Sequence, residues 1–385
     1  MTEPPGDVTP VPPDPPAYLR PPLPAGETPA EGPPPLPFTP IVSAVDLSPR
    51  PFRFTGTAGE YFRIWIVNLL LSVLTLGIYS AWAKVRRLRY FYGHTSLDGR
   101  PFGYHASPIA ILKGRLIAYA VVLVLAVLGN VAPLAASALY LPLLMVMPIV
   151  LVRAFRFRAA NSSYGGIRFG FDGLESESYR VFLLLPITVP FTLGLTYPYV
   201  TKRQREFFVA DSRHGRSQFG LELPTWPVYR IYLLAGLAAL VAVVLGSVML
   251  VGASPGGAVD PDARPGPEVI LAVLMLYAGF GLIVVGVRVA FENLAWNHTW
   301  LDRHRFDSRL RIGRMLGLYA TNVAAILVTL GLAVPWARIR MARYRAESLT
   351  LVPGGPLVTA ELPHGLDAAA TSAELSDAMD LDFGL

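Results

Sequence analysis

The sequence contains no cysteine and few charged residues. The absence of cysteine among 385 residues excludes disulfide bonds, thiolate nucleophiles and iron–sulfur clusters. Asp, Glu, Lys and Arg make up 16% of the chain, against about 25% in soluble proteins. Apolar residues reach 53%, and the mean hydropathy is +0.45. This composition excludes an ordinary water-soluble protein.

The charges that are present avoid long stretches of the chain. No Asp, Glu, Lys or Arg occurs in residues 116–152, 231–253 or 269–287. A helix of about 20 apolar residues crosses the roughly 30 Å hydrocarbon core of a bilayer. We therefore predict an all-α integral membrane protein, a multi-pass helical bundle with internal repeats. Its apolar segments are residues 64–82, 116–129, 134–152, 181–200, 231–253, 269–289 and 315–334.

Patterns for catalysis and metal binding are also lacking. No two of the six histidines are four residues apart, the spacing that a metal site on a helix needs. The sequence therefore predicts no catalytic residue, no metal ligand, no cofactor and no enzymatic activity. The net charge of +6 is accounted for by basic segments at the membrane surface, so nucleic acid is not an expected partner.

The two ends of the chain differ from its middle. The first fifty residues hold 17 of the 36 prolines, which predicts a disordered tail, and they lack the basic start and apolar core of a cleavable signal peptide. The last 25 residues contain acidic residues and no Lys or Arg, which predicts a solvated acidic tail. We divide the chain into residues 1–50 (Pro-rich tail), 51–178 (first membrane repeat), 179–310 (second membrane repeat), 311–350 (partial third repeat) and 351–385 (acidic tail).

An internal repeat lies in three of the apolar segments. The motif Thr-Leu-Gly at 75–77, followed by a Trp-Ala and a basic run, recurs at 329–331 with an offset of 254 residues. The same offset relates Asn68 to Asn322. A weaker copy begins with Thr-Leu-Gly at 192–194.

A second repeated element follows the helices. A Ser or Thr precedes a Phe by seven residues at Thr95 to Phe102, Ser162 to Phe169, Ser212 to Phe219 and Thr299 to Phe306. Residues 155–158 and 167–171 alternate with period two on either side of a polar turn at 162–166, which predicts a β-hairpin. We predict small, basic β-hairpin arms on the cytoplasmic side of the membrane, with residues 52–54 as a lone copy of a second strand.

These motifs resemble a known family. The Thr-Leu-Gly and Trp-Ala-Lys-Val-Arg stretch at 75–86 and the Phe-x-Phe-x-Gly sequence at 52–56 are similar to the YjgN-like family of bacterial inner-membrane proteins, a domain of unknown function. The resemblance covers about residues 50–350. It implies a multi-pass protein of the bacterial inner membrane and supplies no activity, ligand or catalytic residue. The segment at 181–200 departs from the pattern, because Tyr199 stands where the first copy has Trp82.

Charge placement suggests a topology. Loops rich in Lys and Arg remain in the cytoplasm, and all five arms are basic. Seven spans would leave two arms on the opposite side of the membrane from the other three. The conflict disappears if segments 64–82, 181–200 and 315–334 enter the bilayer and turn back, so that four segments span as two hairpins. Seven ordinary spans with an imperfect charge bias remain the alternative.

Three classes of function fit such a protein. A transporter or channel is favoured by re-entrant elements in repeats, with Asn68 and Asn322 as candidate intramembrane polar groups. A scaffold that binds anionic lipids is the alternative, and a membrane-embedded enzyme comes last. Anionic lipid headgroups are the predicted partners, and a homo-oligomer or an unidentified solute is left open. The candidate headgroup contacts are Lys84, Arg86, Arg87, Arg89, Lys202, Arg203, Arg338 and Arg340.

Overall fold

The computed structural model describes residues 47–252 and 266–355, which belong to one compact unit. The predictions for the two tails therefore lie almost wholly outside the described residues. The segments that were predicted as residues 1–50 and 351–385 do contribute short strand ends, because the first strand begins at Arg50 and the last ends at Val352.

The strands overturn the prediction of an all-α fold, because they close into an antiparallel barrel. The order around the barrel is β1-β10-β9-β8-β7-β6-β5-β4-β3-β2. The strands at 52–54 and 167–171 were predicted correctly. Residues 155–158, predicted as the strand before the turn, are instead helical, because the helix of residues 133–160 continues through them. The closure of the hairpins into one barrel was not predicted. The strands are β1 Arg50–Phe54, β2 Thr95–Leu97, β3 Arg100–Tyr104, β4 Ser162–Tyr164, β5 Ile167–Phe171, β6 Ser212–His214, β7 Ser217–Leu221, β8 Thr299–Leu301, β9 His304–Ser308 and β10 Leu349–Val352.

The barrel is built from five units, each a strand, a helical segment that leaves the barrel, one that returns, and a second strand. The two strands of each unit pair with each other, as β1 does with β2 and β5 with β6. Two-residue turns with positive φ, such as Asp98 and Gly99, join successive units. The pairing of β10 with β1 closes the ring, so the lone strand completes a fifth hairpin. The units are residues 50–97, 100–164, 167–214, 217–301 and 304–352.

In the first, third and fifth units, hereafter the short units, the two helical parts meet at the Thr-Leu-Gly motif. A left-handed leucine followed by a left-handed glycine breaks the helix there, as at Leu76 and Gly77, with φ of 50° and 91°. The same pair of conformations recurs at Leu193 and Leu330 with their glycines. The helical parts are α1 Ala58–Leu74 and α2 Ser80–His94; α5 Glu175–Tyr179, the π-helix η2 Arg180–Leu184, α6 Leu185–Phe191 and α7 Tyr197–Ala210; and α10 Ile312–Val328 and α11 Val334–Glu347.

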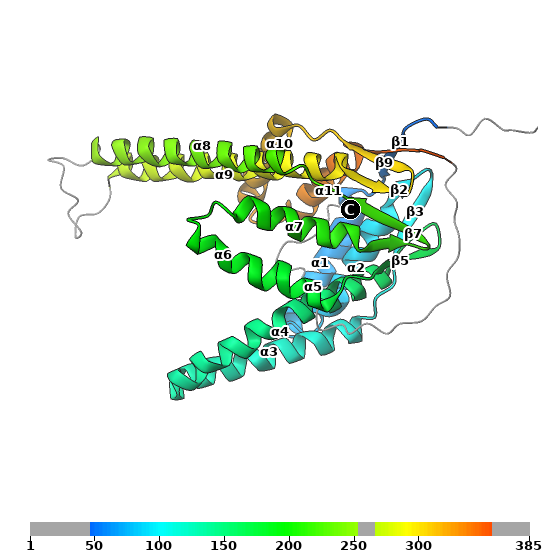
Figure 1. Cartoon of the computed structure of the whole chain (residues 1–385), viewed down its shortest axis with the longest axis horizontal. Coiled ribbons are helices and arrows are strands. Elements are labelled where there is room, and N and C mark those ends of the chain that lie inside the picture. The colour runs from blue at the N-terminus through cyan, green and yellow to red at the C-terminus, as the bar shows by residue number, and fades with distance from the viewer. Residues whose placement is uncertain (1–46, 253–265, 356–385) are drawn as a thin grey trace, which may run out of the picture. The chain divides into compact units, whose positions relative to one another are not determined.

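In the second and fourth units, hereafter the long units, the helices are continuous and longer. They are α3 Pro108–Val131 and α4 Pro133–Ala160, and α8 Thr225–Gly252 and α9 Pro267–Asn297. Within the described residues these four are long and apolar enough to cross a membrane, and at most 22% of their most apolar stretches is buried. Each pair runs side by side as a hairpin of helices (Figure 1).

Five phenylalanines fill the inside of the barrel. They occupy the third position of the second strand of each hairpin, where side chains on alternate residues face one side. The rings of Phe52 and Phe102 are 6.0 Å apart between centroids, and those of Phe219 and Phe306 are 6.3 Å apart. The phenylalanine ring consists of Phe52, Phe102, Phe169, Phe219 and Phe306, and it belongs to the largest hydrophobic cluster.

Candidate functional site

A hydroxyl group marks the point where each returning helix gives way to a strand. The Thr95 hydroxyl donates to the Phe91 carbonyl at 2.8 Å, and the Ser162 hydroxyl to that of Arg158 at 2.9 Å. Ser212 and Thr299 make the same bond to the carbonyl four residues earlier, at 2.7 and 2.8 Å. These bonds bring a side-chain donor to carbonyls in the last turn of each helix; the Phe91 carbonyl, for example, also accepts from the Thr95 N–H. The repeated Ser or Thr in the sequence is therefore a helix-ending device.

The residue before each of these hydroxyls has a similar role. His94 and His298 donate from Nδ1 to the carbonyl four residues earlier, at 2.8 Å in both cases, and Asn161 donates from its amide at 2.7 Å. These bonds give the two histidines a capping role. Asp211 holds the equivalent position in the third unit. Its burial, followed by the charges of Glu177 and Asp172, raises its pKa to about 6.

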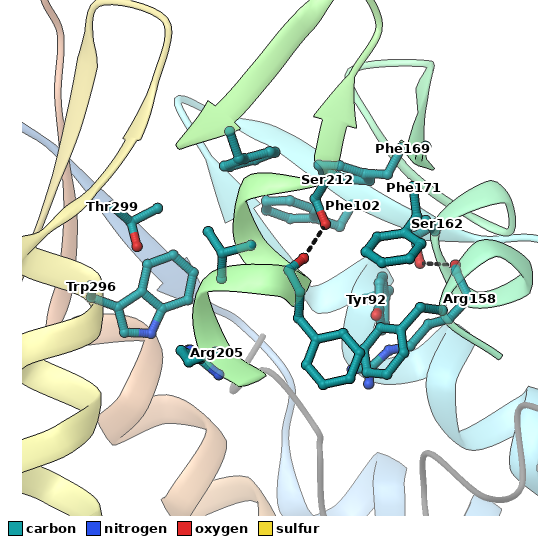
Figure 2. A pocket seen from close by; sticks show the side chains of 16 residues that line it. Tyr92, Phe102, Arg158, Ser162, Phe169, Phe171, Arg205, Ser212, Trp296 and Thr299 are labelled. Atoms are coloured by element: carbon teal, nitrogen blue, oxygen red, sulfur yellow. Dashed lines mark hydrogen bonds between the residues drawn. The ribbon is translucent and has the colours of Figure 1, made fainter. Parts of the chain in front are cut away.

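A cavity of about 140 Å³, hereafter the central cavity, lies between the phenylalanine ring and the ends of four returning helices. Figure 2 shows aromatic side chains on most of its wall and two guanidinium groups, those of Arg158 and Arg205. These arginines are the charged residues among the sixteen that line it. The lining residues are Tyr92, Phe102, Phe155, Arg158, Ala159, Ser162, Phe169, Gly170, Phe171, Arg205, Phe208, Val209, Ser212, Phe219, Trp296 and Thr299.

The two arginines act on each other electrostatically. Burial lowers the pKa of Arg205 to about 10, the charge of Glu292 raises it, and the charge of Arg158 lowers it further. Glu292 also lies 3.9 Å from Arg345. Arg205 is therefore subject to the charges of one carboxylate and one guanidinium. The sequence marked Arg158 and Arg205 as basic arm residues, but nothing local indicated that two arms would share a cavity.

A second cavity of about 290 Å³ has ion-paired walls. Arg203 contacts Glu206 at 2.9 Å and Glu177 at 3.4 Å, and Lys202 donates to the Thr225 hydroxyl at 2.8 Å. The two residues Lys202 and Arg203, predicted as headgroup contacts, thus have partners inside the protein. Across the described part of the chain, no group of three or more His, Asp or Glu side chains could hold a metal ion.

The other predicted headgroup contacts lie on α2 and α11 and differ in exposure. Arg86, Arg89 and Arg338 are exposed, whereas Arg87 and Arg340 are half-buried and Lys84 is buried. The Arg340 guanidinium lies 4.4 Å from the centre of the Trp336 ring. The structure does not bring all eight basic residues onto one surface. Binding of lipid by any of them stays a prediction.

Asn68 and Asn322 link the two helices of a short unit. Each is buried, and its amide donates across the turn, to the Ala83 carbonyl at 3.5 Å and to that of Ala337 at 3.4 Å. The Asn322 side-chain oxygen also accepts from Arg340 at 3.1 Å. Neither asparagine lines the two cavities described above. The predicted pair of polar groups therefore contributes hydrogen bonds between helices.

A closed barrel with four apolar helices long enough to span defines a multi-pass membrane protein. The chain belongs to the family described as "Bacterial protein of unknown function (DUF898)", whose model matches residues 49–378, and this confirms the resemblance.

The chain is 25% identical to the inner membrane protein YjgN of Salmonella typhimurium over 360 residues, which are 80% of this chain and 90% of the relative. It is 30% identical to the protein of the same name from Escherichia coli K12 over 165 residues, 42% of this chain and 41% of that one. No solved structure matches. We conclude that this is an inner-membrane protein of unknown function.

Proposed function

We propose that the chain is a membrane scaffold that binds anionic lipids. In this proposal the barrel lies at the cytoplasmic surface, the long units cross the bilayer, and the short units enter it only part of the way. The observation that carries the proposal is the apolar tip of each short unit. The side chains of Leu76, Leu193 and Leu330 are 94–95% exposed at these tips.

The tips are suited to lipid and not to water. Apolar residues two positions before and after the tip leucine of the first unit, Leu74 and Ile78, are also exposed. The apolar part of α1, residues 64–74, is about 16 Å long at 1.5 Å per residue, roughly half of a hydrocarbon core. A short unit can therefore reach the middle of the bilayer and return.

Strand pairing supports the part-way insertion of the short units. Strands β1 and β2 lie before and after the first short unit, and they pair with each other. The same holds for β5 with β6 and for β9 with β10. A segment whose two ends share one sheet cannot begin and end on opposite sides of a membrane. This argues against seven ordinary spans.

Arg86, Arg89 and Arg338 supply the headgroup contacts in this proposal. They are exposed on the helices that return from the tips to the barrel. Lys or Arg beside a membrane attracts anionic headgroups by about 1 kcal/mol each. The basic side chains also favour the cytoplasmic side for the barrel.

The test compares lipid selectivity in nanodiscs of mixed phosphatidylglycerol and phosphatidylcholine, each holding the full chain. Mass spectrometry of the lipids that stay bound after release from the disc measures their anionic fraction. We expect the triple variant R86Q/R89Q/R338Q to lose most of the enrichment in phosphatidylglycerol. The control R100Q/R216Q/R303Q removes the same charge at the barrel end farthest from the helices and should keep it. Equal enrichment in both variants contradicts the proposal.

Transport ranks second. The re-entrant form of the short units favours it, since irregular backbone at membrane depth often lines a substrate path. Against it, the phenylalanine ring fills the barrel, and Asn68 and Asn322 bond between helices. Flux of ions or small solutes across the membrane of proteoliposomes that hold the chain would place transport ahead of the scaffold function. An enzyme ranks last, because His94 and His298 cap helices.

A further inference from the structure

The central cavity has a composition that suits a ligand of two parts. Its wall is mostly aromatic and aliphatic, and Arg158 and Arg205 supply its charge. We propose that the central cavity binds a phosphate group joined to an apolar body, with the two arginines on the phosphate. This site is separate from the exposed basic residues of the proposed scaffold function and does not depend on it.

The first support is position. The cavity is lined by four of the five units, from Tyr92 in the first to Thr299 in the fourth. It lies against the phenylalanine ring, at the end of the barrel from which the helices leave. A ligand in the cavity contacts several units at once.

The second support comes from comparing the units with one another. Arg205 lies seven residues before the first residue of its strand, and the other units have Leu88, Phe155, Glu292 and Ala342 there. At the position equivalent to Arg158, four before the strand, three units have an apolar residue, Phe91, Phe208 or Ala295, and the fifth unit has Arg345. Apolar residues at both positions are thus compatible with the same fold. The two arginines are not needed to build a unit, which points to a role in binding.

The third support is electrostatic. Arg158 and Arg205 come from different units and act on each other as like charges at the edge of an apolar space. Two guanidinium groups that face one space recognise a phosphate well, because their N–H groups donate to its oxygens and their charges are both offset. No carboxylate lines the cavity, so a metal cation is not the expected occupant.

The volume limits the ligand. A cavity of about 140 Å³ is close to the roughly 150 Å³ that holds one benzene molecule. It accommodates a phosphate with a few carbon atoms and not a whole diacyl lipid. The phosphate can belong to the headgroup of a lipid whose chains stay outside, or to a free small organic phosphate.

The experiment measures binding to the full chain in a mild detergent by thermal shift and by native mass spectrometry. The probes are dihexanoyl phosphatidic acid, dihexanoyl phosphatidylcholine, glycerol 3-phosphate and inorganic phosphate. We expect one bound phosphatidic acid per chain. Phosphatidylcholine should bind more weakly, because its phosphate is esterified with choline. Binding of phosphatidic acid alone assigns the site to a lipid headgroup, and equal binding of glycerol 3-phosphate assigns it to a free organic phosphate.

The variants R205L and R158A carry residues found at the equivalent positions of other units, Leu88 and Ala295. Each should weaken binding of phosphatidic acid by about tenfold or more. The double variant R158K/R205K keeps the positive charges and should retain part of the binding; it replaces the other two variants in the test if they do not fold. The control R100Q/R216Q should bind as the unchanged chain does. The scaffold variant R86Q/R89Q/R338Q should also keep this binding, which separates the two proposals. Equal affinity in R205L, R158A and the unchanged chain, or equal affinity for all four probes, overturns the proposal.

Discussion

The short and long units occupy the same frame and differ in what connects their two strands. Fifty residues separate Phe52 from Phe102 and Phe169 from Phe219, which lie on either side of short units. Across the two long units, the corresponding phenylalanines are 67 and 87 residues apart. The additional residues lengthen the apolar helices. The barrel therefore fixes where each unit begins and ends, and the connection decides how far it extends.

The difference shows that a repeat can keep its strands while the length of its helices changes. In a short unit, two residues with positive φ end one helix and allow the next to return at once. In a long unit the helix continues for 24 to 31 residues, which at 1.5 Å each exceeds a hydrocarbon core of about 30 Å. Each prediction below tests one side of this comparison.

The largest expected effect concerns access to the connections. Because the chain has no cysteine, single cysteines can be introduced without a prior change. A cysteine at Leu76, Leu193 or Leu330 should be unreactive toward a membrane-impermeant maleimide from either side, because the proposed arrangement places these tips in lipid. Asn130→Cys, at the far end of a long unit, should react from the periplasmic side. The measurement compares maleimide labelling of each variant in intact and in opened cells.

A cysteine at Arg216 or Arg303, on the hairpin turns, provides the control for sidedness. Both should react only in opened cells. Reaction of either one in intact cells would restore the seven-span alternative, since that alternative assigns these two arms to the periplasm.

The next effect concerns the barrel, which both kinds of unit share. Phe52→Ala, in a short unit, and Phe102→Ala, in a long unit, each remove a buried ring. Each should lower the free energy of unfolding by about 3–5 kcal/mol, as measured by thermal or denaturant unfolding in detergent. Phe62→Ala removes a ring that is 37% exposed and should cost much less. A large difference between the two barrel variants would argue against a shared core.

A smaller effect is expected at the turns of the short units. Gly331→Ala introduces a side chain at φ of +94° and should lower the free energy of unfolding by about 1–2 kcal/mol. Gly286→Ala in α9 meets no atom within 4 Å, and should raise it by up to about 1 kcal/mol. The two thermal unfolding shifts should therefore have opposite signs. The same sign for both would mean that the left-handed turn does not matter.

The smallest effect depends on pH and concerns Asp211. Its pKa is raised from 3.8 to about 6 in the folded state, so the folded chain holds this proton more tightly than the unfolded chain does. The resulting stability is present below about pH 4 and is lost as the pH rises through 6. At pH 8, Asp211→Asn should therefore raise the free energy of unfolding by about 1 kcal/mol, a value reduced because the side chain is only partly buried. At pH 4 the same substitution should change the free energy of unfolding little.

Asn161 shows that an asparagine fits this position, because its amide donates to the helix carbonyl. Asp302→Asn makes the same change of side chain on an exposed hairpin turn and serves as the matched control. An equal gain at both pH values for Asp211→Asn would mean that the hydrogen bond, and not the charge, is responsible.

Much of the fold could be predicted from short-range patterns. The alternation at 167–171 predicted the second strand of a hairpin, although its first strand was placed at 155–158, in what is a helix. The 254-residue offset related Thr75 to Thr329. The central cavity could not be predicted in this way. Arg158 and Arg205 are 47 residues apart, and they share a cavity only because β5 and β6 pair beside β4. The residues of a hairpin determine its turn, but they do not determine which other strands pair with it.

The sequence by itself determined the membrane class, the apolar segments and the position of the hairpins. These follow from composition and from periodicity over a few residues, which act locally. Only the tertiary structure decided that five hairpins, one of them divided between Phe52 near the start and Leu351 near the end, close into one barrel. The physical reason is that the backbone N–H and C=O groups at the edges of these short strands find hydrogen-bond partners only on strands that are distant in the sequence.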